Sequence, residues 1–119
     1  MDYATKNLGK KVKIKIDRPL GSNHPDFNYI YLVNYGFVPG TEAPDGEEID
    51  AYVLGVDKKL LEFTGKCIAV IHRCDDNDDK LIVVPEGKTY SDKEIMKIVH
   101  FQEKYFKSKV IRKVSKKCR

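Results

Sequence analysis

The sequence has no long apolar run and few cysteines. No stretch approaches the ~20 apolar residues of a membrane-spanning helix, and the first residues lack the apolar segment of a secretion signal. We therefore expect a cytoplasmic protein that has no membrane partner. The three cysteines, Cys67, Cys74 and Cys118, form no CxxC pair, which argues against a disulfide framework or a zinc site and favours reduced thiols.

Internal repeats, linkers and low-complexity tracts are also absent, and the three histidines form no catalytic constellation with serine or cysteine. Covalent catalysis by a histidine-activated nucleophile is therefore not supported. A chain of 119 residues can bury about two thirds of its unfolded surface. We expect one domain over residues 1–119, of which residues 107–119 form a basic C-terminal end.

Charge is distributed unevenly along the chain. The net charge is +4, yet residues 26–79 carry 12 acidic side chains and only 4 basic ones. Residues 107–119 carry 7 basic side chains and no acidic one. An acidic middle segment suggests a site that gathers cations, and basic ends can attract anions. Runs of charge are also common on solvated surfaces, so the distribution alone leaves both interpretations open.

Five short segments have the alternating or continuous apolar character of β-strands. These segments are residues 11–16, 29–33, 49–56, 67–72 and 81–84, and residues 110–111 favour one further short strand. Pro39 and Gly40 mark a tight turn. A capping box from Ser91 to Glu94, followed by apolar residues at helical spacing, predicts a helix that ends near Lys107. The predicted fold is mainly β (α+β), a small β-barrel with one C-terminal helix packed on it.

Two acidic loops carry the candidate chemistry. They are residues 45–50 (Asp-Gly-Glu-Glu-Ile-Asp) and residues 75–80 (Asp-Asp-Asn-Asp-Asp-Lys), and each leads into a predicted strand. Like charges at this density repel one another unless cations bind between them. Carboxylate oxygens suit Mg²⁺, Mn²⁺ or Ca²⁺ better than Zn²⁺, but neither loop has the spacing of an EF-hand. The residues alone leave divalent-metal binding and a merely solvated hairpin tip equally open.

Four segments, in this order, resemble the soluble, single-domain, metal-dependent inorganic pyrophosphatases. The segments are residues 34–37 (Asn-Tyr-Gly-Phe), 45–50, 78–85 (Asp-Asp-Lys-Leu-Ile-Val-Val-Pro) and 100–105 (His-Phe-Gln-Glu-Lys-Tyr). The resemblance implies a five-stranded OB-like barrel and an enzyme that hydrolyses inorganic pyrophosphate to two phosphates. It also implies Mg²⁺ as the cofactor, with Mn²⁺ suiting the same oxygen ligands, and association into a homo-oligomer.

The resemblance assigns roles to individual residues of this sequence. The implied metal ligands are Asp45, Asp50, Asp75, Asp76 and Asp78, with Asp75 and Asp76 as alternatives and Asp50 as the bridge of a metal pair. Glu47 stands where the family has an aspartate that orients or deprotonates the attacking water, so Glu47 and Asp50 are the implied catalytic residues. The implied phosphate contacts are Arg18, Tyr35, Lys80 and Tyr105.

Three features depart from the family pattern. Glu47 is longer than the usual aspartate by one methylene group, and Phe106 stands where the family has a lysine. We expect the family's early strands, which supply a phosphate-binding lysine and two glutamates, to be missing here, unless Lys13 or Lys15 substitutes for that lysine. The metal site is thus nearly complete, whereas the anion site is thinned.

Two other functions therefore stay open. The thinned anion site favours a weakened or retargeted phosphoanhydride hydrolase, or a module that binds phosphate through divalent metal. An OB-like barrel with a basic tail could instead bind single-stranded nucleic acid, stacking bases on its tyrosines. The acidic middle segment would repel a nucleic-acid backbone, so we rank nucleic acid last among the expected partners.

Overall fold

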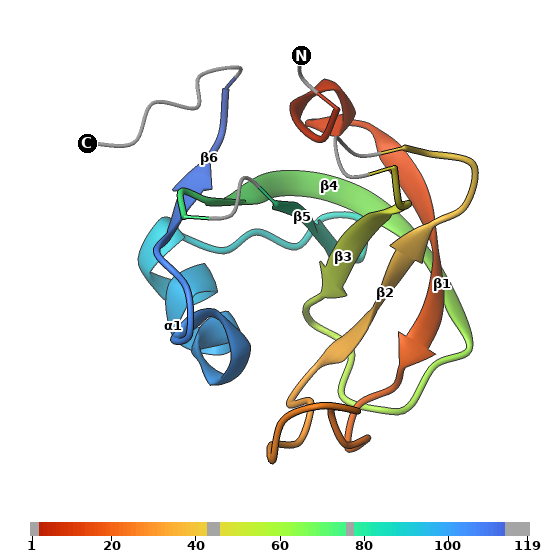
Figure 1. Ribbon diagram of the computed structural model, residues 1–119. Helices are drawn as coiled ribbons and strands as arrows, with labels where there is room; N and C mark the ends of the chain where they lie inside the picture. The colour runs from red at the N-terminus through yellow and green to blue at the C-terminus, as the bar shows by residue number, and fades with distance from the viewer. Residues whose placement is uncertain (1–2, 43–45, 76–77, 114–119) are drawn as a thin grey trace.

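The computed structural model describes residues 3–42, 46–75 and 78–113 (Figure 1). After a short 3₁₀ turn at Thr5–Asn7, the elements are β1 (Lys11–Arg18), β2 (Asn34–Val38), β3 (Ile49–Val53), β4 (Glu62–Arg73), β5 (Asp79–Val84), α1 (Asp92–Glu103) and β6 (Ser108–Ile111). The sheet order is β1-β2-β3-β5-β4-β6, and β1 also pairs with β4, so the first five strands close into a barrel. This architecture confirms the predicted five-stranded barrel with one helix.

Strand direction alternates around the barrel except at one position. The β1–β2, β2–β3, β4–β5 and β1–β4 pairs are antiparallel, and β6 adds to β4 in the same sense. Strands β3 and β5 are parallel, with Asp50 opposite Lys80 and Ala51 opposite Leu81. Parallel partners have side chains in register on the same face. Residues from the two acidic loops therefore enter the sheet side by side.

Two apolar clusters lie on opposite faces of the curved sheet. In β1, Val12, Ile14 and Ile16 point into the barrel and alternate with exposed residues. In β3 and β5 the odd-numbered residues also face the interior, whereas even-numbered ones such as Tyr52 and Ile82 pack in a second cluster with α1. Both faces of these strands are buried, which explains their nearly continuous apolar sequences. Asp50 and Lys80 have the parity of the outer, helix-covered face.

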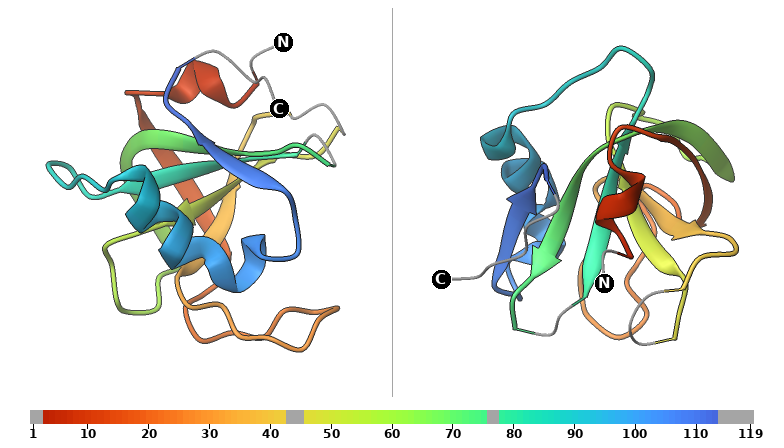
Figure 2. Two further views of the ribbon diagram at one scale, coloured as in Figure 1. Left: turned by 90° about the vertical axis from the view of Figure 1, so that its left-hand side faces the viewer. Right: turned by 90° about the horizontal axis from the view of Figure 1, so that it is seen from above.

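Helix α1 covers the outer face of the barrel (Figure 2). The predicted capping box is present: the Glu94 amide donates to Ser91 Oγ at 3.1 Å, and the Ser91 amide donates to Glu94 Oε1 at 2.8 Å. The helix buries Ile95 and Val99 against the sheet and ends at Glu103, because the chain must turn there to enter β6. Among the described residues, no helix has the length and apolar composition to cross a membrane.

The predicted strand at residues 29–33 is wrong. These residues belong to an irregular connection in which only Ile30 makes a β-bridge, to Asn23. Strand β2 occupies residues 34–38 instead, where it pairs with β1. A Cβ on Gly36 would lie 2.0 Å from the Lys15 carbonyl oxygen, so glycine is the residue that permits this close approach of the two backbones. Tyr31 is buried against the second cluster, so the aromatic character of 29–33 reflects packing rather than strand pairing.

The cysteines differ in state. Cys67 is a free thiol buried in the barrel interior, and burial raises its pKa to about 11. Cys74 is disulfide-bonded, so the prediction of three reduced thiols is wrong for this residue. Cysteine spacing along the sequence does not report which residues folding brings together, and an odd count does not exclude one pair.

Candidate active site

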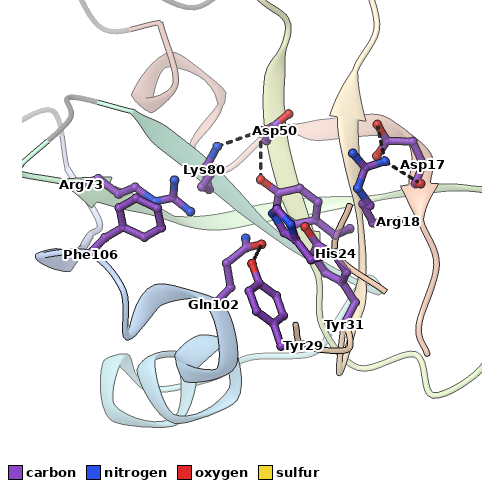
Figure 3. A pocket seen from close by; sticks show the side chains of 11 residues that line it. Asp17, Arg18, His24, Tyr29, Tyr31, Asp50, Arg73, Lys80, Gln102 and Phe106 are labelled. Carbon is purple, nitrogen blue, oxygen red and sulfur yellow. Dashed lines mark hydrogen bonds and ion pairs between the residues drawn. The ribbon is translucent and has the colours of Figure 1, made fainter. Parts of the chain in front are cut away.

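Two adjoining cavities lie on the helix-covered side of the barrel. The first has a volume of about 250 Å³, and its charged and aromatic lining includes Arg18, Arg73, Lys80, Tyr29, Tyr31 and Tyr35 (Figure 3). The second has a volume of about 270 Å³ and is lined by Asp17, Phe37, Glu47, Glu48, Asp50 and Asp78. Asp17 and Asp50 belong to both cavities. A basic cavity and an acidic cavity therefore share one wall.

The shared wall is built around Asp50. The Lys80 ammonium donates to Asp50 Oδ2 and to Asp78 Oδ2, each at 2.7 Å, and the Tyr35 hydroxyl donates to Asp50 Oδ2 at 2.9 Å. Lys80 is almost fully buried, whereas the Asp50 side chain is 37% exposed. The parallel pairing of β3 and β5 sets this contact, because Asp50 and Lys80 are register partners. Four of the residues that the sequence singled out thus meet in one place.

Tyr35 is held as a hydrogen-bond donor in this cluster. Burial raises the pKa of its hydroxyl well above the usual value, and the neighbouring Asp50 carboxylate raises it further. The hydroxyl therefore keeps its proton and directs it at the Asp50 carboxylate. The carboxyl of Asp17 also has a raised pKa, through burial and the negative charges of Asp50 and Glu48, although Arg18 opposes this effect.

Arg73 is a cavity residue that the sequence reasoning missed. Its Nε and Nη2 donate to the Glu103 carboxylate at 3.1 and 2.8 Å, and its Nη1 lies 3.6 Å from Asp78 Oδ2. Burial lowers the pKa of the guanidinium, but the hydrogen bonds and charge of Glu103 outweigh burial and raise it overall. Arg73 is one of only four basic residues within positions 26–79 and lies beside the second acidic loop. A single basic residue beside an acidic loop was the sequence feature that could have identified Arg73 as a candidate site residue.

The Arg73 guanidinium also lies over the Phe106 ring, with its central carbon 3.7 Å from the ring centre. A guanidinium stacked on an aromatic face gains a cation–π attraction that strengthens as water is excluded. Phe106 is the position where the resemblance leads us to expect a lysine. A cation is therefore present at the cavity wall, but it comes from the end of β4 rather than from the residue after Tyr105.

A buried polar network positions the cavity wall against the helix. The carboxylate of Glu103 accepts from the Tyr52 hydroxyl at 2.5 Å and from Ser108 Oγ at 2.6 Å. The Tyr52 oxygen accepts from Gln102 Nε2 at 2.7 Å, and Gln102 Oε1 accepts from the Tyr29 hydroxyl at 2.7 Å. These hydrogen bonds connect α1 to β3, to β6 and to the β1–β2 connection. Buried networks of this kind fix relative positions because each unsatisfied group would be costly.

The remaining predicted site residues lie at different depths. Glu47 is exposed and lines the acidic cavity. Asp75 is exposed and accepts a hydrogen bond from the Lys107 amide at 3.1 Å, and it does not line either cavity. Tyr105 is 53% exposed and lies outside the cavity lining, with its ring 5.6 Å from that of Tyr29. Asp45 and Asp76 lie outside the described residues.

The acidic cavity has the donor chemistry of a hard divalent cation. Every charged residue that lines it is a carboxylate, and oxygen ligands are those that Mg²⁺ and Mn²⁺ prefer. Within residues 3–42, 46–75 and 78–113, no three acidic, histidine or cysteine side chains already form a complete ligand group. The Lys80 ammonium lies between Asp50 and Asp78, 2.7 Å from a carboxylate oxygen of each. The residues therefore fit a divalent cation in kind, with a lysine ammonium between two of the candidate ligands.

Comparison with known proteins identifies the family. A model of the inorganic pyrophosphatase family matches residues 5–116. The chain belongs to the inorganic pyrophosphatase family. It is 36% identical over 109 residues to an inorganic pyrophosphatase of Saccharolobus solfataricus, covering 77% of this chain and 60% of the relative. It is 33% identical over 117 residues to an inorganic pyrophosphatase of Aquifex pyrophilus, covering 82% of this chain and 66% of the relative.

The chain spans 42% to 66% of the length of the curated relatives it matches, and it covers 50% of soluble inorganic pyrophosphatase 2 of Chlamydomonas reinhardtii. The fold extends to solved structures of low sequence identity. An inorganic pyrophosphatase from Ehrlichia chaffeensis superposes with a TM-score of 0.66 at 20% identity, covering 86% of this chain and 85% of that chain. The structure from Coxiella burnetii gives 0.60 at 21% identity, covering 84% and 83%. These likenesses support the barrel fold.

Proposed function

We propose that the protein hydrolyses inorganic pyrophosphate to two phosphates in the presence of Mg²⁺. The observation that carries the proposal is the pair of adjoining cavities, one basic and one acidic, that meet at Asp50 in a chain of this family. A polyanionic substrate fits the first cavity, and the cations that must accompany it fit the second. No single cavity of either sign would accommodate both.

The proposed substrate contacts lie in the basic cavity. Arg18, Arg73 and Lys80 supply positive charge around the phosphates, and charge-assisted hydrogen bonds to phosphate oxygens are the stronger kind. The Tyr35 hydroxyl, which keeps its proton, would turn it from Asp50 to a phosphate oxygen once the Asp50 carboxylate binds a cation. Tyr105 would act at the rim rather than in the cavity wall. Charge fixed before the reaction begins stabilises the leaving phosphate as negative charge develops on it.

The proposed Mg²⁺ ligands are the carboxylates of Asp45, Asp50 and Asp78, with either Asp75 or Asp76, and Mn²⁺ would suit the same oxygens. Bound divalent ions would lower the pKa of a water molecule and neutralise charge on the phosphates. For its part, Lys80 would exchange one of its two carboxylate partners for a phosphate oxygen when those carboxylates turn to the cation. Before the divalent cation binds, the buried Lys80 ammonium thus keeps the Asp50 and Asp78 carboxylates close together.

Glu47 is the proposed group that orients the attacking water and accepts its proton. It lines the acidic cavity together with Asp50 and does not line the basic cavity. A base in this place need only lie within hydrogen-bonding distance of the water, about 3 Å. The extra methylene group of glutamate changes its reach by ~1 Å, and a misplacement of that size can lower a rate by ~100-fold.

The test is phosphate release from pyrophosphate with and without Mg²⁺, with tripolyphosphate and ATP as comparison substrates. We expect release from pyrophosphate that depends on Mg²⁺. Asp50→Asn should lose at least ~100-fold in kcat/KM, the equivalent of several kcal/mol at ~1.4 kcal/mol per tenfold. Asp57→Asn is the matched control, because Asp57 is exposed and lines neither cavity. Equal activity of the two variants would refute the central role of Asp50.

A further inference from the structure

Three aromatic rings form a nearly parallel group beside the basic cavity. This ring cluster consists of Phe27 and Tyr29, from the connection between β1 and β2, and Tyr105, which follows α1. The interplanar angles are 7°, 11° and 18°, and the ring centres are separated by 6.3, 6.0 and 5.6 Å for the Phe27–Tyr29, Phe27–Tyr105 and Tyr29–Tyr105 pairs. The pairs around Phe101 are edge-to-face instead, whereas His24 and Tyr31, which line the basic cavity, are also stacked at 12°.

Two of the three rings are unusually open to water. Phe27 is 55% exposed and Tyr105 is 53% exposed, whereas Tyr31 and Tyr52 are 2% and 0% exposed. Exposed apolar area that is grouped rather than scattered is typical of a binding surface. The ring cluster is therefore distinct from the apolar core, because the neighbouring core aromatics are buried whereas Phe27 and Tyr105 are exposed.

The ring cluster is continuous with the basic cavity. Tyr29 belongs to both the cluster and the cavity lining, and His24, which also lines the cavity, has its ring 4.9 Å from those of Phe27 and Tyr29. Figure 3 shows His24 and Tyr29 around the same cavity as Arg73 and Lys80. Cations that suit phosphates and a flat aromatic surface thus occur along one continuous wall.

We propose that the protein binds nucleoside diphosphates, with the base stacked on the ring cluster and the phosphates in the basic cavity. This inference rests on the proposed function of that cavity and adds a class of substrate to it. A nucleobase presents a flat π-face, and stacking of a base on an aromatic side chain depends little on which base it is. Bare pyrophosphate would use only the cavity, whereas a nucleoside diphosphate would use the cavity and the rings.

Hydrolysis of such a substrate would follow the same course as that of pyrophosphate. The oxygen of water bonds to the terminal phosphorus, and the bond between that phosphorus and the bridging oxygen breaks. The products are a nucleoside monophosphate, inorganic phosphate and one proton, which Glu47 would take first and release to solvent. No co-reactant besides water is needed.

The experiment compares two ligands that resist hydrolysis. Adenosine 5′-(α,β-methylene)diphosphate and methylenediphosphonate are titrated into the protein with Mg²⁺ by calorimetry. The nucleotide analogue should bind about 10-fold more tightly than the diphosphonate, the low-to-middle part of the range for stacking one base. In Phe27→Ala the ratio of the two affinities should fall by about 10-fold. Leu32→Ala, which removes a 61% exposed side chain from the same connection, should leave the ratio unchanged.

Each other result has a definite meaning. If methylenediphosphonate binds and the nucleotide analogue binds no more tightly, the inference is overturned while the proposed pyrophosphatase function stands. If neither ligand binds, the proposed phosphate cavity is refuted and the nucleotide site with it. Tighter binding of a single-stranded oligonucleotide than of the nucleotide analogue, lost in Phe27→Ala, would overturn the inference in favour of single-strand recognition.

Discussion

The guanidinium of Arg73 lies 3.7 Å above the ring of Phe106, a contact between the end of β4 and the chain just beyond α1. Both positions bear on which residue supplies positive charge at the cavity wall. Phe106 takes the place where the family resemblance leads one to expect a lysine, and Arg73 brings a cation to the same cavity wall from another element. In the proposed phosphate site, Arg73 would supply part of the positive charge that the sequence motifs lack.

The Arg73–Glu103 pair should contribute strongly to stability. Both side chains are buried, at 7% and 0% exposure. Arg73→Ala would leave the Glu103 carboxylate buried without its cation, which typically costs about 3–5 kcal/mol. Unfolding in urea measures the effect. Lys13→Ala is the control, because its pair with Glu62 is exposed on both sides and worth at most ~1 kcal/mol. Equal losses in the two variants would contradict the prediction.

The same carboxylate should make stability depend on pH. Burial alone would raise the pKa of Glu103, but hydrogen bonds from Arg73, Ser108 and Tyr52 outweigh it and lower the pKa below the ordinary 4.5. A carboxyl with a depressed folded pKa stabilises the fold above its unfolded pKa. This stabilisation is lost as pH falls from 4.5 through the folded value.

Unfolding free energies measured from about pH 6 to pH 3 should therefore fall less steeply in Glu103→Gln than in wild type. Glu62→Gln serves as the control, since Glu62 is exposed on the barrel surface and should leave the slope unchanged. A Glu103→Gln variant with the wild-type slope would show that another carboxylate governs acid unfolding.

Metal should stabilise the folded state through the acidic cavity. Several millimolar Mg²⁺ should raise the melting temperature by about 5 °C, because a ligand that binds only the native state shifts the unfolding equilibrium. Asp50→Asn should abolish this shift, whereas Asp57→Asn should keep it. Differential scanning calorimetry with and without Mg²⁺ measures it. An unchanged shift in Asp50→Asn would place the metal elsewhere.

Glu47 offers a test of the proposed general base. Glu47→Asp restores the side chain that the family resemblance implies, so turnover of pyrophosphate should rise or stay near wild type. Glu47→Gln should lower turnover by about 100-fold, the smaller end of general-base effects. Its Mg²⁺-dependent melting shift should persist, because the other carboxylates remain.

A fully active Glu47→Gln enzyme would contradict that role. The neighbouring candidate would then be Glu48, which also lines the acidic cavity and whose Oε2 accepts from the Gly40 amide at 3.3 Å. Steady-state phosphate release from Glu48→Gln would decide between the two, since only the working carboxylate should be sensitive to loss of its charge.

Local patterns predicted the parts of the fold that local forces determine. The alternation of Val12, Ile14 and Ile16 identified β1, and the Ser91–Glu94 capping box identified the start of α1. The same reasoning misplaced the second strand, because β-branched and aromatic residues record burial and not pairing. Tyr31 is buried by packing against the helix layer, while the adjacent strand is defined by a glycine that lets two backbones approach. Both features depend on contacts between segments that are distant in sequence, so a short stretch of sequence does not contain them.

The candidate site divides in the same way. The motifs identified Asp50, Tyr35 and Lys80, and in the structure both Tyr35 and Lys80 donate a hydrogen bond to Asp50. Arg73 belongs to no motif, and its guanidinium is positioned at the cavity by Glu103, a hydrogen-bond partner 30 residues away in sequence. Contacts across such separations depend on how β4 crosses the barrel, which no local pattern encodes. The roles assigned to all the predicted site residues stay predictions for the kinetic tests above.

The parallel pairing of β3 and β5 places Asp50 opposite Lys80 through main-chain hydrogen bonds. The register is set inside the two strands, so a change of length in an exposed part of a connection would leave this pair in place. One residue deleted inside either strand would instead slip the register and turn a charged side chain into the barrel interior. Insertions and deletions among relatives should thus fall in the connections, and β3 and β5 should each remain without gaps.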